Sequence, residues 1–265
     1  MNPMLNTAIK AAREAGEIIT YNASKIDQLN IEQKGINDFV SEVDKKAEEQ
    51  IIYLLKKAYP DHSILGEESG EHTVQGSDYE WIIDPLDGTT NYLYGIPHYA
   101  VSIALRHKGR LKVGVVYDPI KDEMFSAARG EGARVNNRRL RVSGRKSMHN
   151  ALLTTGFPYK PSQNLPLFIK TLEALIPDTA GIRRPGSAAL DLAYVAAGRF
   201  DGFWEFKLNA WDIAAGVLIV QEAGGLISDL TGGNTHLKTG DVLAASPKVF
   251  KEMLKRLHPI ITQAS

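Results

Sequence analysis

The sequence contains no cysteine, and this absence removes several kinds of chemistry. Without a thiol the chain has no disulfide, no thiolate metal site and no cysteine nucleophile. It also has no run of about 20 apolar residues, the length needed to cross a bilayer. The first six residues lack the basic segment and apolar run of a secretory signal. We therefore expect a cytoplasmic protein that makes no membrane contact.

Net charge is absent as well, because 31 basic residues balance 31 acidic ones. No overall field would draw the protein to nucleic acid or to an anionic membrane. A local basic patch stays open, because five arginines gather in one short stretch: Arg134, Arg138, Arg139, Arg141 and Arg145. We interpret this stretch as the solvated face of a hairpin, with contact to nucleic acid as the alternative.

The spacing of the apolar residues predicts a mixed α+β fold. Helical spacing is found at residues 3–21, 41–59, 167–175, 187–197, 213–223 and from Pro247 onward. Short apolar runs predict strands at residues 81–83, 99–105, 111–117, 124–128, 151–155, 200–206, 226–229 and 242–245. The strands between residues 81 and 128 favour an antiparallel sheet flanked by the first two helices. We expect a single compact domain over residues 1–265, with two halves that meet near residue 145.

Two acidic segments each follow an apolar strand. Residues 66–70 read Gly-Glu-Glu-Ser-Gly after Ile64 and Leu65, and residues 84–91 read Asp-Pro-Leu-Asp-Gly-Thr-Thr-Asn after residues 81–83. Carboxylates at the end of a buried strand need a cation or strong donors. Either segment alone could be a solvated turn. Together they indicate a site where hard oxygen ligands hold Mg²⁺ or Mn²⁺ beside amide groups that bind phosphate.

A third acidic position is Asp212, which follows Trp211 and precedes an apolar helix. The simpler interpretation makes Asp212 the N-cap of that helix. The alternative directs its carboxylate toward the same metals. Asp44 has a comparable place near the start of the helix at residues 41–59, where Ser41 and Asp44 fit a capping box.

These motifs together resemble the inositol monophosphatase family. The family's first signature matches residues 81–92, its second matches residues 211–216 and runs on to 222–225, and the loop at 66–69 matches in the expected order. The resemblance covers essentially the whole chain and is greatest to the bacterial SuhB-type members, including residues 2–6 and 183–191. It implies a layered αβαβα sandwich of the inositol monophosphatase and fructose-1,6-bisphosphatase type.

The resemblance also implies a role for each matching position. Two or three Mg²⁺ ions per site would be held by Glu67, Asp84, the Leu86 carbonyl, Asp87 and Asp212. Asp44, Glu67 and Thr89 would be the catalytic residues that orient an attacking water. The substrate would contact Glu67, Leu86, Asp87, Gly88, Thr89, Arg183, Gly186, Ser187, Ala188, Glu205 and Asp212.

The activity implied is hydrolysis of myo-inositol monophosphate and related polyol phosphates by metal-activated water, with inhibition by lithium. A homodimer is implied too. Sugar bisphosphatases of the same superfamily stay open as an alternative. A second alternative is the role in transcription antitermination implied for SuhB-type proteins, with NusA and RNA as partners.

Overall fold

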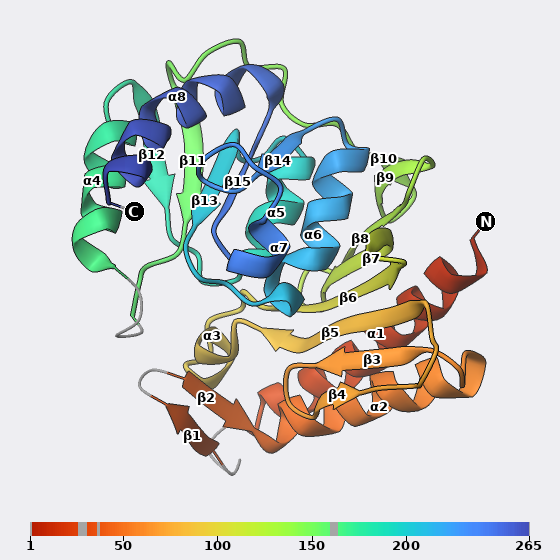
Figure 1. The fold of residues 1–265 in the computed structure, drawn as a ribbon. Coiled ribbons are helices and arrows are strands. Elements are labelled where there is room, and N and C mark those ends of the chain that lie inside the picture. Colours follow the sequence, from red (N-terminus) through yellow and green to blue (C-terminus); the bar gives the residue numbers. More distant parts are fainter. Residues whose placement is uncertain (1, 26–30, 36–37, 160–163, 265) are drawn as a thin grey trace.

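The structure is a computed structural model that describes residues 2–25, 31–35, 38–159 and 164–264. Its helices and sheets alternate in five layers (Figure 1). The outer helices on one side are α1 (Pro3–Ala23) and α2 (Glu42–Ala58), and those on the other side are α4 (Leu165–Leu175) and α8 (Pro247–Ala264). Between the two sheets lie α5 (Ala188–Ala196) and α6 (Ala210–Glu222). The expected αβαβα sandwich is therefore confirmed.

The larger sheet has eight strands in the order β10-β9-β8-β7-β6-β5-β3-β4. Their bounds are β3 (Ser63–Gly66), β4 (Gly70–His72), β5 (Tyr79–Asp87), β6 (Ala100–His107), β7 (Arg110–Asp118), β8 (Glu123–Ala128), β9 (Gly132–Val135) and β10 (Arg138–Arg139). The predicted antiparallel pairing of the strands between residues 81 and 128 is found in β5 to β8, and it continues to β10. The strand β3 was not part of that prediction, and it pairs with β5 in parallel. The reason is β4, which forms a hairpin with β3 at the edge and so returns the chain to the start of β5. Parallel pairing brings the ends of β3 and β5 to one edge of the sheet.

The smaller sheet has five strands in the order β12-β11-β13-β15-β14. They are β11 (Ala151–Thr155), β12 (Thr179–Arg183), β13 (Gly202–Glu205), β14 (Leu226–Ser228) and β15 (Val242–Ala245). The strand β12, which pairs in parallel with β11, was not predicted from the sequence. The remaining elements are short: β1 (Ile31–Gly35), β2 (Asp38–Ser41), α3 (Thr89–Leu93) and α7 (His236–Thr239).

The middle layer explains why one helix is apolar on all sides. Every residue from Ile213 to Val220 in α6 is buried, because the helix lies between the two sheets. The approach to β7 is close: a Cβ on Gly114 would lie 2.7 Å from the carbonyl oxygen of Ala215. Among the described residues, no helix has the length and apolar character that crossing a membrane would require.

Candidate metal and phosphate site

Asp44 lies at the start of α2 and is 1% exposed. Its Oδ2 accepts hydrogen bonds from the Ser41 amide at 2.9 Å and the Ser41 hydroxyl at 2.5 Å, so the capping box is confirmed. Its Oδ1 accepts from the Thr89 hydroxyl at 3.0 Å. Burial raises the pKa of Asp44, although these hydrogen bonds oppose the rise. The hydrogen bond between Thr89 and Asp44 thus joins two residues that are 45 positions apart in the sequence.

The ends of β3 and β5 bring the two acidic segments together. Gly66 pairs with Ile83, and the Glu67 amide donates to the Ile83 carbonyl at 3.1 Å. The register of β5 shifts between Asp84 and Asp87, and the Leu86 amide donates to Asp84 Oδ1 at 2.9 Å. The strand therefore bends where its carboxylates begin.

The turn into α3 follows directly. Gly88 has φ 101°, a left-handed conformation that favours glycine, and a Cβ there would lie 3.0 Å from the His98 carbonyl oxygen. Thr89 Oγ1 also lies 3.0 Å from the Leu86 carbonyl oxygen, which makes that oxygen a second acceptor for the Thr89 hydroxyl. The Leu86 carbonyl, a predicted metal ligand, is therefore directed to the same side as Thr89.

Other carboxylates act most directly on Asp84. Burial raises its pKa well above the usual range, and the carboxylates of Glu67, Asp87 and Asp212 raise it further. Like charges that act on one buried carboxylate are stabilised by a cation between them. Hard carboxylate oxygens suit Mg²⁺, so the donor set fits the predicted ion.

The carboxylates nevertheless do not form a closed cluster. No group of three or more acidic or histidine side chains in the described residues is arranged as a metal site. The metal-binding roles of Glu67, Asp84, Asp87 and Asp212 therefore stay predictions. They are supported by the effect that these groups have on one another's pKa rather than by a preformed geometry.

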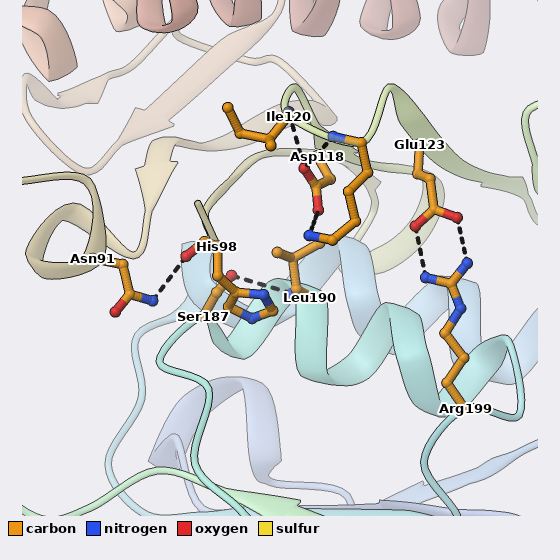
Figure 2. A network of polar contacts seen from close by, with 9 residues as sticks. Asn91, His98, Asp118, Ile120, Glu123, Ser187, Leu190 and Arg199 are labelled. Atoms are coloured by element: carbon orange, nitrogen blue, oxygen red, sulfur yellow. Dashed lines mark hydrogen bonds and ion pairs between the residues drawn. The ribbon is translucent and has the colours of Figure 1, made fainter. Parts of the chain in front are cut away.

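Asp87 joins the end of β5 to the start of α5. Its Oδ2 accepts from the Ser187 hydroxyl at 2.6 Å and from the Ala189 amide at 2.7 Å. Burial raises the pKa of Asp87 to about 6, and these hydrogen bonds hold it from rising further. Ser187 is the N-cap of α5 and faces the Leu190 amide (Figure 2).

Asn91 holds the neighbouring loops together. Its Nδ2 donates to the His98 carbonyl at 2.8 Å, a contact drawn in Figure 2, and to the Pro185 carbonyl at 2.9 Å. The segment after β5 is thereby tied to the loop before α5. Arg199, which follows α5, forms a separate ion pair with Glu123 on β8 (Figure 2).

Asp212 does not cap its helix as the simpler interpretation predicted. The helix α6 begins at Ala210, so Asn209 is the N-cap and Asp212 is the third helical residue. The Asn209 amide donates to Asp212 Oδ2 at 2.6 Å, as in a capping box. The predicted helix start at residue 213 is three residues late, because Trp211 and Asp212 precede the uninterrupted apolar run.

A pocket of about 160 Å³ opens beside these residues. It brings together six predicted positions, which are Asp87, Gly186, Ser187, Ala188, Glu205 and Asp212. Burial and the Asp87 charge raise the pKa of Glu205 to about 8. Asp191 also lines the pocket although the sequence analysis did not select it; it is 1% exposed and accepts from the Thr154 hydroxyl at 2.8 Å.

Arg183 does not line this pocket, whereas its neighbour Arg184 does. The Arg183 side chain lies in a separate pocket with Arg145 and Arg199. The Arg184 guanidinium lies over the Tyr159 ring at 4.9 Å and the Phe157 ring at 5.5 Å. The strand β12 ends at Arg183, so Arg184 belongs to the loop that leads to α5, and recognising β12 would have separated the two arginines.

Known proteins share this architecture along the whole chain. The model of the inositol monophosphatase family matches residues 1–263. The Nus factor SuhB of Pseudomonas aeruginosa is 54% identical over 263 residues, which cover 98% of this chain and 97% of that protein.

Solved structures agree with the sequence comparison. The extragenic suppressor protein suhB of Bartonella henselae has a TM-score of 0.94 at 43% identity and covers 97% of this chain and 98% of its own. The inositol monophosphatase of Anabaena has a TM-score of 0.84 at 37% identity, with 98% and 95% covered. Sequence, fold and the carboxylates at the edge of the larger sheet thus lead to one assignment: the chain belongs to the inositol monophosphatase family.

Proposed function

We propose that this protein is a Mg²⁺-dependent phosphomonoesterase that hydrolyses myo-inositol monophosphate and related polyol phosphates. One observation carries the proposal: three other carboxylates raise the pKa of the buried Asp84, next to the glycine turn that leads into Thr89. Family membership supports phosphatase chemistry. The substrate class and the individual residue roles are our inference.

The metal would be held by Glu67, Asp84, the Leu86 carbonyl, Asp87 and Asp212. When bound, Mg²⁺ supplies Lewis-acid stabilisation of the phosphate and lowers the pKa of a water molecule. We expect two or three ions per site. Asp87 is held in place for this role by Ser187 and Ala189, since both donate to its Oδ2.

The water would be oriented by Thr89 and Asp44. The Thr89 hydroxyl donates toward Asp44 Oδ1, so its oxygen can accept a hydrogen bond from the water. The water oxygen attacks phosphorus as the ester oxygen leaves, and its proton passes through Thr89 Oγ1 to Asp44. The raised pKa of Asp44 suits it to accept that proton. The leaving alkoxide takes a proton from water, which gives the alcohol and inorganic phosphate.

The alcohol part would lie in the pocket beside α5. Gly186 and Ala188 leave space there, and Glu205 places a carboxyl group where substrate hydroxyls can hydrogen-bond. Arg184 adds the only positive charge among the residues that line this pocket in the described part of the chain. This mixture of a carboxyl group and a guanidinium favours a polyol with several hydroxyl groups over an apolar alcohol.

A phosphate-release panel tests the proposal. It would contain inositol phosphates, glycerol phosphates, sugar bisphosphates and nucleotides, each with Mg²⁺ and with EDTA. We expect Mg²⁺-dependent release that is fastest with inositol monophosphates. Preference for a sugar bisphosphate would select the related activity instead, and full release in EDTA would refute the metal mechanism.

A second function is favoured by the relatives' names, because several proteins that are 51–54% identical over nearly their full length are called Nus factor SuhB. We propose a transcription role for this chain too, with NusA and RNA as expected partners, a homodimer as the expected assembly and the cytoplasm as the compartment. Purified NusA and a ribosomal leader RNA should each be tested by titration. Absence of binding to both would remove this second function and leave the phosphatase proposal untouched.

A further inference from the structure

Glu48 is a buried carboxylate that the proposed reaction does not use. It lies on α2 one turn after Asp44 and is 1% exposed. Its Oε2 accepts from the Glu68 amide at 3.0 Å and its Oε1 accepts from the Ser69 amide at 2.7 Å. Both amides belong to the loop that immediately follows Glu67. A carboxylate that accepts two backbone N–H groups fixes the loop that carries them.

The space for this contact is provided by Gly66, the last residue of β3. A Cβ on Gly66 would lie 2.7 Å from Cδ and from both carboxylate oxygens of Glu48. Its φ is not in the left-handed region, so conformational freedom does not explain the glycine. The close approach of the Glu48 carboxylate explains why residue 66 is a glycine.

The backbone around Glu67 is therefore held on both sides. Its own amide donates to the Ile83 carbonyl on β5, and the next two amides donate to Glu48 on α2. The helix that bears Glu48 is rigidly seated, because Val43, Ala47, Ile51 and Leu55 are fully buried in the core it shares with the larger sheet. Through Asp44, the same helix also holds Thr89.

We propose that Glu48 is a positioning residue: it sets the direction of Glu67 and thereby the affinity of the site for Mg²⁺. This inference rests on the proposed function for the role of Glu67. Glu48 is not assigned as a ligand, and both of its oxygens face the backbone amides of the loop that follows Glu67. Its effect reaches the metal through the loop at residues 66–69.

The test compares Glu48→Gln with Glu49→Gln in the full-length protein. Glutamine keeps the size of Glu48 but replaces one acceptor oxygen by an NH₂ group, which faces an amide donor. Glu49 is exposed on the same helix, so its variant makes the same charge change without the contacts. Calorimetric titration with Mg²⁺ or Mn²⁺ gives the dissociation constant, and phosphate release across Mg²⁺ concentrations gives kcat and the half-saturating concentration.

We expect about tenfold weaker metal binding in Glu48→Gln, which is about 1.4 kcal/mol. Its kcat at saturating Mg²⁺ should stay within about twofold of wild type, because the reacting groups are intact. Glu49→Gln should match wild type in both measurements. An unchanged dissociation constant in Glu48→Gln would overturn the proposal, and so would a fall in kcat that excess Mg²⁺ does not restore.

Gly66→Ala gives a second route if Glu48→Gln does not fold. The added methyl group displaces the Glu48 carboxylate, so weaker metal binding is expected again, and unaltered binding would overturn the proposal. The two proposals can fail separately. If wild type binds Mg²⁺ but releases no phosphate from any ester, the proposed function fails, and the calorimetric difference still decides the role of Glu48.

Discussion

Several acidic side chains at this site lie where burial makes a negative charge costly. Asp84, Asp191 and Glu205 all have raised pKa values, with burial as the largest cause. Each is also affected by another carboxylate nearby. Natural proteins retain such groups mainly where they bind or react. Ionising these buried carboxyl groups lowers the stability of the folded protein, so stability measurements test the site without any substrate.

Replacing Glu205 tests this cost. Its pKa in the folded protein, about 8, lies above its ordinary value of 4.5. The folded state therefore binds the proton more tightly, and the associated stability is present below pH 4.5 and is lost as pH rises through 8. We expect Glu205→Gln to melt at the same temperature as wild type at pH 5 in EDTA, and at a higher temperature at pH 9. Parallel melting curves across that range would contradict the burial of a charged Glu205.

Substrate selection should depend on Arg184 rather than Arg183. Arg184 lines the pocket beside α5, whereas Arg183 lines a separate pocket. Arg184→Ala should raise the KM for inositol monophosphate several-fold with little change in kcat, because the contact would be to the part that does not react. Arg183→Ala is the matched control and should leave the KM unchanged. The reverse pattern would restore the original sequence prediction.

The sequence predicted much of this site because its motifs are local. Asp84, Asp87, Gly88 and Thr89 lie in one short segment that ends a strand, and the structure keeps them together. Glu48 and Asp191 were missed for a physical reason. Their partners lie 20 or more residues away, and nothing in a helical sequence shows which buried carboxylate meets a distant amide or hydroxyl.

Helices and strands were predicted best where their periodicity is uninterrupted. The strands predicted at residues 99–105, 111–117 and 124–128 correspond closely to β6, β7 and β8. By contrast, β12 contains Gly181 and Arg183 within five residues, which weakens its strand pattern. The parallel pairing of β3 with β5 was missed as well, because strand direction depends on where β4 lies and not on the composition of either strand.

The contact between α6 and β7 gives a prediction for a whole element. A methyl group on Gly114 would press on the α6 backbone at Ala215. We expect Gly114→Ala to destabilise the protein by about 1–3 kcal/mol and to lower activity, because α6 carries Asp212. Denaturant unfolding measures the first effect and phosphate release the second.

Gly144→Ala is the control for that experiment. Gly144 is exposed, its φ is not positive, and beyond its two chain neighbours no atom of the described residues lies within 4 Å of its added Cβ. Its replacement should be neutral or stabilise slightly, since alanine restricts the unfolded chain. Equal destabilisation by both variants would mean that the loss comes from glycine itself and not from the contact with α6.

In the molecule as a whole, the two sheets are joined through one shared core. The strands of the larger sheet come from residues 63–139 and those of the smaller from residues 151–245, yet α5 and α6 share one core with both sheets. The first half therefore depends on helices from the second. A single domain with halves that meet near residue 145 stays our prediction.

Calorimetry tests that prediction. We expect one unfolding transition at fixed protein concentration, with equal calorimetric and van't Hoff enthalpies, because both sheets bury their inner faces in the one core that α5 and α6 share with them. Two transitions, or separate loss of the signals from Trp81 in the first half and Trp204 in the second, would show two independently stable domains.

If the carboxylates around Asp84 hold the metal on which phosphate release depends, replacing Asp84 by asparagine should abolish most of that release. Asparagine keeps an oxygen for the Leu86 amide and removes a charge that is costly at this buried site. Phosphate release from inositol monophosphate should therefore fall at least about 100-fold at limiting Mg²⁺, while the melting temperature in EDTA stays equal to wild type or rises. Release near the wild-type rate would contradict the claim.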